Sequence, residues 1–336
     1  MKVALSLSCQ HPPGTNMRDH LSQHLRQAAL AAELGFAGVF SFEHFLLPAH
    51  QMLHQTTFLG RVAAEVPGLD VGTGISLAAL HNPVELADAA ATLDVITGGR
   101  FIFGVGLGYR DVENAAFGID PRTRVGRMEE ALDVLERLWG GEPVSYQGKH
   151  FQLHDVRISL RPLQQPRPPI WLAANADVAV RRAARLGDAW LMNPHSTLTT
   201  LERQLARFHE TREGLGRPPA RTIPLIRECY VAPDARTALE EAQPFLEAKY
   251  AAYRSWEQDK ALPSSESFAH DFATLARDRF LIGDPERVRE EIVRYQARLG
   301  ITDLIVRVQW PGMDPARVLR SIRLLGDEVL PRLVVS

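Results

Sequence analysis

The stretch Glu33-Leu34-Gly35-Phe36-Ala37-Gly38-Val39-Phe40 joins the end of a predicted helix to a short apolar strand. The helical pattern ends on a glycine, which can adopt the left-handed conformation that commonly closes a helix. The same arrangement recurs at Thr97-Gly98-Gly99-Arg100, Arg185-Leu186-Gly187 and Arg298-Leu299-Gly300. A helix, a short loop and a buried strand, repeated along the chain, indicate βα units and a parallel sheet.

Eight strands of this kind are predicted along the chain. They cover residues 3–7, 39–41, 69–75, 101–105, 170–173, 189–192, 223–231 and 303–308. Eight βα units in about 250–340 residues indicate a (β/α)8 TIM barrel, because doubly wound sheets usually have fewer strands. We therefore expect one barrel domain over residues 1–336, with insertions at 142–168 and 256–279, after strands 4 and 7.

The composition excludes several classes of protein. The chain has 38 basic and 40 acidic residues among 336, a net charge of -2, so nucleic acid or an anionic membrane has no electrostatic reason to bind it. No run reaches the ~18 apolar residues of a membrane span, and the apolar start is too short for a signal peptide. Cys9 and Cys229 lack a CxxC spacing, which favours a reduced, cytoplasmic location.

Chemistry in such barrels lies where the strands end at their carboxyl side. Polar residues follow several of the predicted strands: Glu43-His44, Ser76 to Asn82, Gly106 to Arg110, Ala174 to Asp177, Asn193-Pro194-His195 and Gln309-Trp310. There is no HExxH metal motif, no GxSxG elbow and no P-loop. His20 and His24 are expected to be solvated, on the outer face of the first helix.

Glycines are concentrated in Gly104-Val105-Gly106-Leu107-Gly108. The run does not complete a GxGxxG fingerprint, because Tyr109 occupies the next position. Two explanations remain open at this point: close approach of backbone N–H groups to an anion, or plain tight-turn geometry. The turn at Asn175 opens a helix, whose N-terminal dipole favours a phosphate.

Several ordered motifs together resemble the bacterial luciferase-like flavin monooxygenases. The motifs are Leu34 to Phe45, Val71-Gly72-Thr73-Gly74, His81 to Ala87, Ala91-Thr92-Leu93-Asp94, Gly98 to Phe101, Gly104 to Arg110, Pro169-Ile170-Trp171-Leu172 and Arg181 to Trp190. The likeness covers nearly the whole chain and weakens between about 221 and 281. It implies a (β/α)8 barrel that binds reduced FMN or a deazaflavin at the carboxyl ends of its strands.

The resemblance also implies a set of site residues. His44 takes the position of the catalytic histidine, and the cofactor-binding positions are Glu43, Gly74, Ile75, Leu107, Tyr109, Arg110, Ala174, Asn175, Ala176 and Asp177. Glu43 would lie near the flavin ring, and the Gly74-Ile75 peptide would be cis and bulge toward it. Luciferases have a phosphate-pairing arginine where this chain has Leu107, so backbone N–H groups and Arg110 would hold the phosphate around 174–177.

The leading functional hypothesis is a two-component monooxygenase. Reduced FMN would come from a separate reductase and react with molecular oxygen, with His44 as the acid/base group. The alternatives are a deazaflavin-dependent hydride-transfer dehydrogenase or reductase, and a non-catalytic flavin-binding barrel. Tyr109 favours FMN, because relatives with sugar-phosphate substrates have a glutamate there. No metal is expected.

The expected substrate is a small hydrophobic molecule. Large apolar residues would line the mouth of the barrel: Phe42, Phe45, Leu46, Leu47, Met52, Met192 and Trp310. A homodimer is also expected. The predicted helix over 84–96 contains Ala87, Ala89, Ala90 and Ala91, small enough for another helix to approach, and luciferase-like proteins form their subunit contact in this region.

Overall fold

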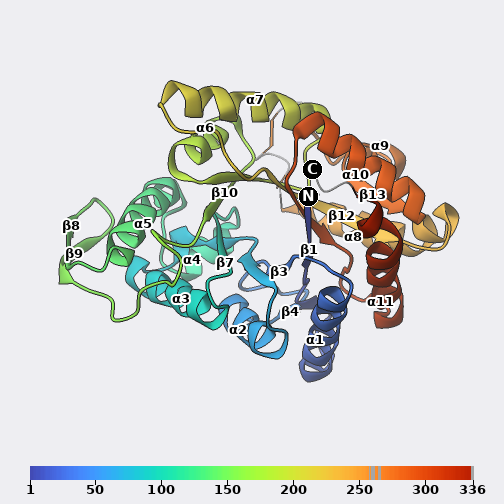
Figure 1. Cartoon of the computed structure of the whole chain (residues 1–336), viewed down its shortest axis with the longest axis horizontal. Coiled ribbons are helices and arrows are strands. Elements are labelled where there is room, and N and C mark those ends of the chain that lie inside the picture. Colours follow the sequence, from blue (N-terminus) through green and yellow to red (C-terminus); the bar gives the residue numbers. More distant parts are fainter. Residues whose placement is uncertain (257, 259–261, 264–265, 334–336) are drawn as a thin grey trace.

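Eight parallel strands close into a barrel surrounded by helices (Figure 1). The structure is a computed structural model, and it describes residues 1–256, 258, 262–263 and 266–333. The barrel strands, in spatial order, are β1 (Lys2–Ser6), β3 (Gly38–Ser41), β5 (Asp70–Thr73), β7 (Phe101–Gly106), β10 (Ile170–Ala174), β11 (Ala189–Met192), β12 (Pro224–Val231) and β14 (Asp303–Arg307). Pairing of β14 with β1 closes the ring. The predicted (β/α)8 barrel is confirmed, and each predicted strand overlaps an observed one.

Helices form the outer layer of the barrel (Figure 1). They are α1 (Met17–Glu33), α2 (Gln55–Glu65), α3 (Pro83–Ile96), α4 (Asp111–Ala116), α5 (Arg124–Trp139), α6 (Asp177–Leu186), α7 (Leu198–Gly214), α8 (Ala235–Ser255), α9 (Phe272–Ala276), α10 (Pro285–Leu299) and α11 (Pro315–Leu324). The start signals in the sequence are confirmed at α3 and α10, where the side chains of Asn82 and Asp284 accept hydrogen bonds from the first turn.

Several short strands lie outside the eight-stranded barrel. The strands β2 (Gln10–His11) and β4 (Gln51–Met52) pair with each other, and β6 (Ser76–Leu77) extends the sheet beside β7. The hairpin of β8 (Val144–Gln147) and β9 (Gln152–Val156) projects beside α5 (Figure 1), within the predicted insertion 142–168. The strand β13 (Phe280–Gly283) pairs with β12 and was not predicted. Part of the predicted insertion 256–279 lies outside the described residues.

Apolar side chains fill two separate regions. Inside the barrel, Phe40 and Trp171 stack with ring centroids 5.6 Å apart, and Leu191 and Ile305 pack with them. A larger cluster lies between the strands and the helical layer. Strands buried on both faces explain why the sequence shows continuous apolar runs there.

The helix-end glycines differ from one another. Gly35 and Gly300 have φ of 80° and 64°, as the pattern predicts. Gly187 has φ of -94°, so the prediction of a left-handed glycine is wrong at this position. A Cβ there would lie 3.0 Å from the carbonyl oxygen of Ala189 and 3.2 Å from the Cβ of Leu172. Close packing of the loop against β10 therefore explains the glycine.

The histidines of α1 also differ from expectation. His24 is completely buried, and its Nε2 lies 2.8 Å from Nε2 of His11 on β2. The prediction of a solvated face is therefore wrong for His24, because β2 and α2 pack against this part of the helix, with the Phe58 ring 5.7 Å from the His24 ring. Burial lowers the pKa of His24 to about 3 and that of His11 to about 4, helped by the neighbouring histidines.

The alanines of α3 pack largely within the chain. Ala87, Ala90 and Ala91 are buried, and the indole N–H of Trp139 on α5 donates to the carbonyl of Ala87. These side chains serve the contact between α3 and the rest of the fold. Within the described part of the chain, no helix is both long and apolar enough to cross a membrane.

Candidate active site

His44 follows β3 at the carboxyl end of the barrel, and its side chain is 14% exposed. Its Nδ1 lies 3.0 Å from Oε1 of Glu113 on α4. A carboxylate only accepts hydrogen bonds, so Nδ1 is the donor and carries the hydrogen. Nε2 is then the ring nitrogen left to exchange a proton with a bound molecule.

Glu113 is the centre of a buried network. Its Oε1 also accepts from the backbone N–H of Phe45, at 2.8 Å, and from Nη1 of Arg110, at 2.9 Å. Burial acts to raise the pKa of Glu113, but the hydrogen bonds and charge of its partners, His44 first, outweigh burial and lower it. The carboxylate is therefore ionised at neutral pH, and it fixes the orientation of His44.

Arg110 faces the loop after β3. Its guanidinium donates to the carbonyl oxygens of Phe45, at 2.5 Å, and Leu46, at 3.1 Å, and it is paired with Glu113. The sequence suggested that Arg110 could hold a phosphate. The structure instead commits its donors to the backbone next to His44.

Glu43 lies beside His44 and is buried. Its Oε2 accepts from the backbone N–H of Leu77, at 2.7 Å, and lies 3.0 Å from Nε2 of His81. Burial acts to lower the pKa of His81, but Glu43 and Glu85 outweigh it, and the pKa is raised. Glu43 thus holds together the ends of β3, β6 and the segment before α3.

The Gly74–Ile75 peptide lies between β5 and β6, and it is cis, as the resemblance predicted. A Cβ on Gly106 would overlap the Ile75 side chain, and one on Gly104 would overlap the backbone oxygen of Thr73. Close packing of β7 against this segment therefore explains these two glycines, and it is neither of the two explanations that the sequence left open. Gly108, with φ of 72°, makes the tight turn that follows.

Leu107 and Tyr109 lie in the loop between β7 and α4. The Tyr109 ring packs against the His44 ring, with centroids 5.8 Å apart. Its hydroxyl is buried and makes no hydrogen bond with any residue that the structure describes. A buried hydroxyl without a partner is unusual in a protein, and it marks a place where a bound molecule could accept or donate a hydrogen bond.

Residues Ala174 to Asp177 join β10 to α6. Ala176 is the N-cap of α6 and has no side chain that could accept a hydrogen bond from the first turn. The side chain of Asp177 points toward α7, where it pairs with Arg203 and Arg207. The N–H groups of this first turn fit an anion such as a phosphate.

The apolar residues expected at the mouth divide into two groups. Phe45, Leu46, Leu47 and Met52 line a cavity of about 230 Å³ that also includes Glu43 and His44. Phe42, Met192 and Trp310 are buried in packed surroundings. The second group therefore packs in the interior and does not line this cavity. Trp310 has a polar partner, because its indole N–H donates to Glu228 at 2.7 Å.

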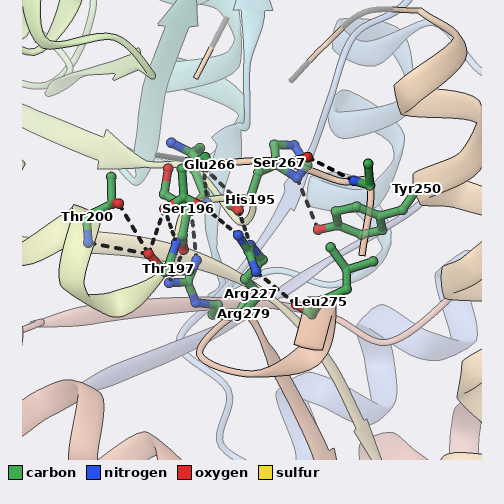
Figure 2. A network of polar contacts seen from close by, with 12 residues as sticks. His195, Ser196, Thr197, Thr200, Arg227, Tyr250, Glu266, Ser267, Leu275 and Arg279 are labelled. Carbon is green, nitrogen blue, oxygen red and sulfur yellow. Dashed lines mark hydrogen bonds and ion pairs between the residues drawn. The ribbon is translucent and has the colours of Figure 1, made fainter. Parts of the chain in front are cut away.

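A polar network holds the segment after α8 against the barrel (Figure 2). Nδ1 of His195, which follows β11, lies 3.1 Å from the hydroxyl of Tyr250 on α8. Arg279 donates to the carbonyl of His195 and pairs with Glu266, whose other oxygen accepts from the backbone of Thr197. These contacts fix α8 across the carboxyl end of β11 and β12.

Sequence reasoning missed several charged residues of this region. They are Glu113, Glu228, Lys249 and Arg307, whereas His81 was included only within the polar run Ser76 to Asn82. Glu113 and Lys249 lie on helices, where a charged residue is ordinarily solvated, and no local motif distinguishes them. Glu228 and Arg307 do give a signal, because each interrupts an apolar strand with a charge.

The fold and the polar strand ends define a barrel of the luciferase-like class, and comparison with known proteins agrees. The sequence model of the luciferase-like monooxygenase family matches residues 1–302, so the chain belongs to this family. The F420-dependent glucose-6-phosphate dehydrogenase of Microbacterium testaceum is 28% identical over 331 residues, which cover 90% of this chain and 91% of that protein.

Solved structures show the same fold. The monooxygenase RslO1 from Streptomyces bottropensis is 26% identical, with a TM-score of 0.86, and the match covers 98% of this chain and 99% of RslO1. The oxygenating constituent of 3,6-diketocamphane monooxygenase from Pseudomonas putida, a type II Baeyer-Villiger monooxygenase in complex with FMN, is 20% identical. Its TM-score is 0.83, and the match covers 99% of each chain. The family thus includes FMN-binding monooxygenases and F420-dependent oxidoreductases.

Proposed function

We propose that this protein is a flavin-dependent oxidoreductase, and specifically the oxygenating component of a two-component monooxygenase that uses reduced FMN on a small organic substrate. The observation that carries the proposal is the orientation of His44. Glu113 holds Nδ1, which leaves Nε2 as the atom available for proton transfer at the end of β3. An imidazole suits this role because it can both accept and donate a proton.

The residues present fit a flavin. The uncapped first turn of α6 would hold the phosphate through backbone N–H groups, near Asn175 and Ala176. The ring would lie toward His44, where the buried hydroxyl of Tyr109 lacks a partner among the described residues. When bound, reduced FMN would supply the electrons and the reactivity toward oxygen that no side chain can supply.

The residues of the chain would then have distinct roles. His44 would hold or move the proton of the reacting group at Nε2, and Glu113 would position it. Glu43 would keep the ends of β3 and β6 together beside His44. The cavity beside Phe45 and Met52 would receive an apolar part of the substrate and exclude water from it.

A deazaflavin-dependent hydride transfer is the second candidate, favoured by the likeness to the F420-dependent dehydrogenase over 90% of the chain. The two candidates differ in whether the reaction needs molecular oxygen. We expect turnover with reduced FMN in air and none with F420, reduced or oxidised, under nitrogen. Hydride transfer without oxygen, either from reduced F420 to a substrate or from a substrate to oxidised F420, would favour the second candidate. Flavin binding without turnover under either condition would indicate a non-catalytic flavin-binding barrel.

The proposal includes two protein partners. Reduced FMN would come from a separate flavin reductase, since the sequence contains no recognisable nicotinamide-binding segment. We also propose a homodimer through the α2 and α3 region, although three alanines of α3 pack within the chain. Light scattering that reports a monomer of 37.4 kDa at micromolar concentration would contradict the dimer. The proposed cytoplasmic location agrees with the two cysteines, which are buried and unpaired.

A further inference from the structure

Three charged side chains from different elements meet at the carboxyl end of the barrel. Glu228 on β12 is fully buried, and its Oε1 forms an ion pair with Nζ of Lys249 on α8. Nη1 of Arg307, on β14, lies 3.9 Å from the same oxygen. The side chains of Lys249 and Arg307 are only 9% and 10% exposed. These three residues are called the mouth cluster below.

The mouth cluster contains two cations and one carboxylate. With both cations protonated it has an excess charge of one, in a place where an uncompensated charge costs several kcal/mol. Burial, together with the charge of Arg307, lowers the pKa of Lys249 to about 7 despite Glu228. Nε of Arg307 is buried and makes no hydrogen bond with the described residues. The cluster therefore has donor capacity and positive charge beyond what Glu228 uses.

The mouth cluster is connected to the proposed catalytic residue by ring contacts. The guanidinium of Arg307 lies over the Phe42 ring, 4.4 Å from its centroid. The Phe42 and His44 rings are 6.1 Å apart, and the His44 and Tyr109 rings 5.8 Å. The Phe42 ring therefore lies between the guanidinium of Arg307 and the His44 ring and contacts both.

We propose that Arg307 and Lys249 bind the carboxylate of an aromatic or other apolar monocarboxylic acid, whose reacting atom then lies toward His44. This inference rests on the proposed function, since it names the substrate class of the same site. The excess of one positive charge favours a carboxylate over a phosphate, because a dianion would leave the cluster with a net negative charge. A guanidinium and an ammonium are suitable donors to carboxylate oxygens.

The test uses four simple probes, each titrated calorimetrically into the full-length protein with and without FMN. Benzoate and octanoate carry the carboxylate, and benzamide and octanamide are their neutral counterparts. At about pH 6 the acids are ionised and Lys249 is largely protonated. We expect at least one acid to bind at least about tenfold more tightly than its amide, the range of a charge-assisted hydrogen bond. Phenyl phosphate should bind no more tightly than benzoate.

Two variants should change this preference in opposite directions. Lys249→Met removes the excess charge, and we expect acid affinity to fall about tenfold while amide affinity is unchanged. Glu228→Gln increases the excess, and we expect acid affinity to rise. A purely structural cluster would weaken binding of acid and amide alike in both variants. Lys2→Met is the matched control, because Lys2 pairs with Asp70 at the opposite end of the barrel.

Thermal unfolding of each variant establishes that it is folded before it is titrated. Equal binding of acids and amides, or no acid binding up to about 10 mM, would overturn the proposal. So would a preference that persists in Lys249→Met, or tighter binding of phenyl phosphate than of benzoate. A carboxylate preference in a protein that binds no flavin would support the acid site while the proposed function fails, so the two failures are distinguishable.

Discussion

Nδ1 of His44 lies 3.0 Å from Oε1 of Glu113, although 69 positions of the chain separate the two residues. The contact joins the end of β3 to α4, the short helix after β7. It converts a histidine at a strand end into an oriented group with one free nitrogen. The same carboxylate binds Arg110, which in turn holds the carbonyls of the two residues after His44. The loop that carries His44 is therefore fixed from one side by a buried ion pair.

Replacement of His44 tests its chemical role. We expect His44→Ala to lower kcat by about 10²–10⁴-fold, the usual contribution of a general acid or base. FMN affinity should change little, because in the proposed site the backbone groups near Asn175 would provide the phosphate contacts. Steady-state kinetics and a flavin titration measure the two quantities. His270→Ala, an exposed substitution, is the control, and unchanged turnover in His44→Ala would reduce His44 to a structural residue.

Glu113→Ala should destabilise the protein by about 3 kcal/mol, since it leaves the buried guanidinium of Arg110 without its carboxylate. Urea unfolding measures the change, with the exposed substitution Glu290→Ala as the control. Glu113→Gln keeps the shape of the side chain, so we expect a smaller loss of stability but lower kcat. Equal stability of Glu113→Ala and wild type would show that the network does not support the loop.

The lowered pKa of Glu113 predicts that the stability of the protein depends on pH. Its pKa is lower in the folded protein than the usual 4.5. Its contribution to stability is therefore present above pH about 4.5 and is lost as the pH falls through the lower, folded value. Glu113→Gln should remove this part of the acid dependence.

The barrel could be predicted because its information is local. A helix end, a glycine and an apolar strand lie within a few residues at Leu34 to Phe40, and parallel strands buried on both faces have continuous apolar sequences. The site was predicted only where a strand end or a family motif marks it, as at His44 and Gly74. Glu113 and Lys249 could not be predicted, because their roles arise when helices distant in sequence fold across the strand ends.

His24 shows the same limit, because β2 and α2 bury a helix face that the sequence pattern assigns to solvent. Gly187 shows a second limit of prediction from sequence. A glycine that follows a helix has the same sequence signature whether it adopts a left-handed conformation or lets two segments approach closely. Only the neighbours, here Leu172 and Ala189, decide between the two.

The glycines of β7 predict the effect of a single methyl group. Gly104→Ala places a Cβ on the backbone oxygen of Thr73, which cannot move without displacing β5. We expect this variant to be destabilised by more than about 3 kcal/mol or not to fold. Gly214→Ala on α7 has open space around its Cβ and should be about 0.5–1 kcal/mol more stable. Urea unfolding that gave the two variants similar stability would contradict the packing described for β7.

The buried pair His11 and His24 predicts acid sensitivity. Both pKa values are lowered, to about 4 and about 3, whereas the unfolded chain binds these protons near 6.5. Stability should therefore fall as the pH decreases from about 7 toward 4, by about 2 kcal/mol at pH 5 for His24 alone. His24→Gln should reduce this pH dependence of stability, as measured by urea unfolding at about pH 7 and about pH 5. The same slope in His24→Gln would contradict the burial of His24, and His270→Gln serves as the control.

The proposed function depends on a bound flavin whose phosphate lies at the first turn of α6, and Ala176→Asp tests this site most directly. Aspartate is a favourable N-cap, so the fold should keep its stability. Its carboxylate would occupy the place proposed for the phosphate, and its negative charge would repel the phosphate. Fluorescence titrations with FMN and with riboflavin, which lacks the phosphate, should show at least about tenfold weaker binding of FMN and unchanged binding of riboflavin. Equal FMN affinity in the variant and the wild type, or no flavin binding by the wild type in either redox state, would contradict the proposed flavin site.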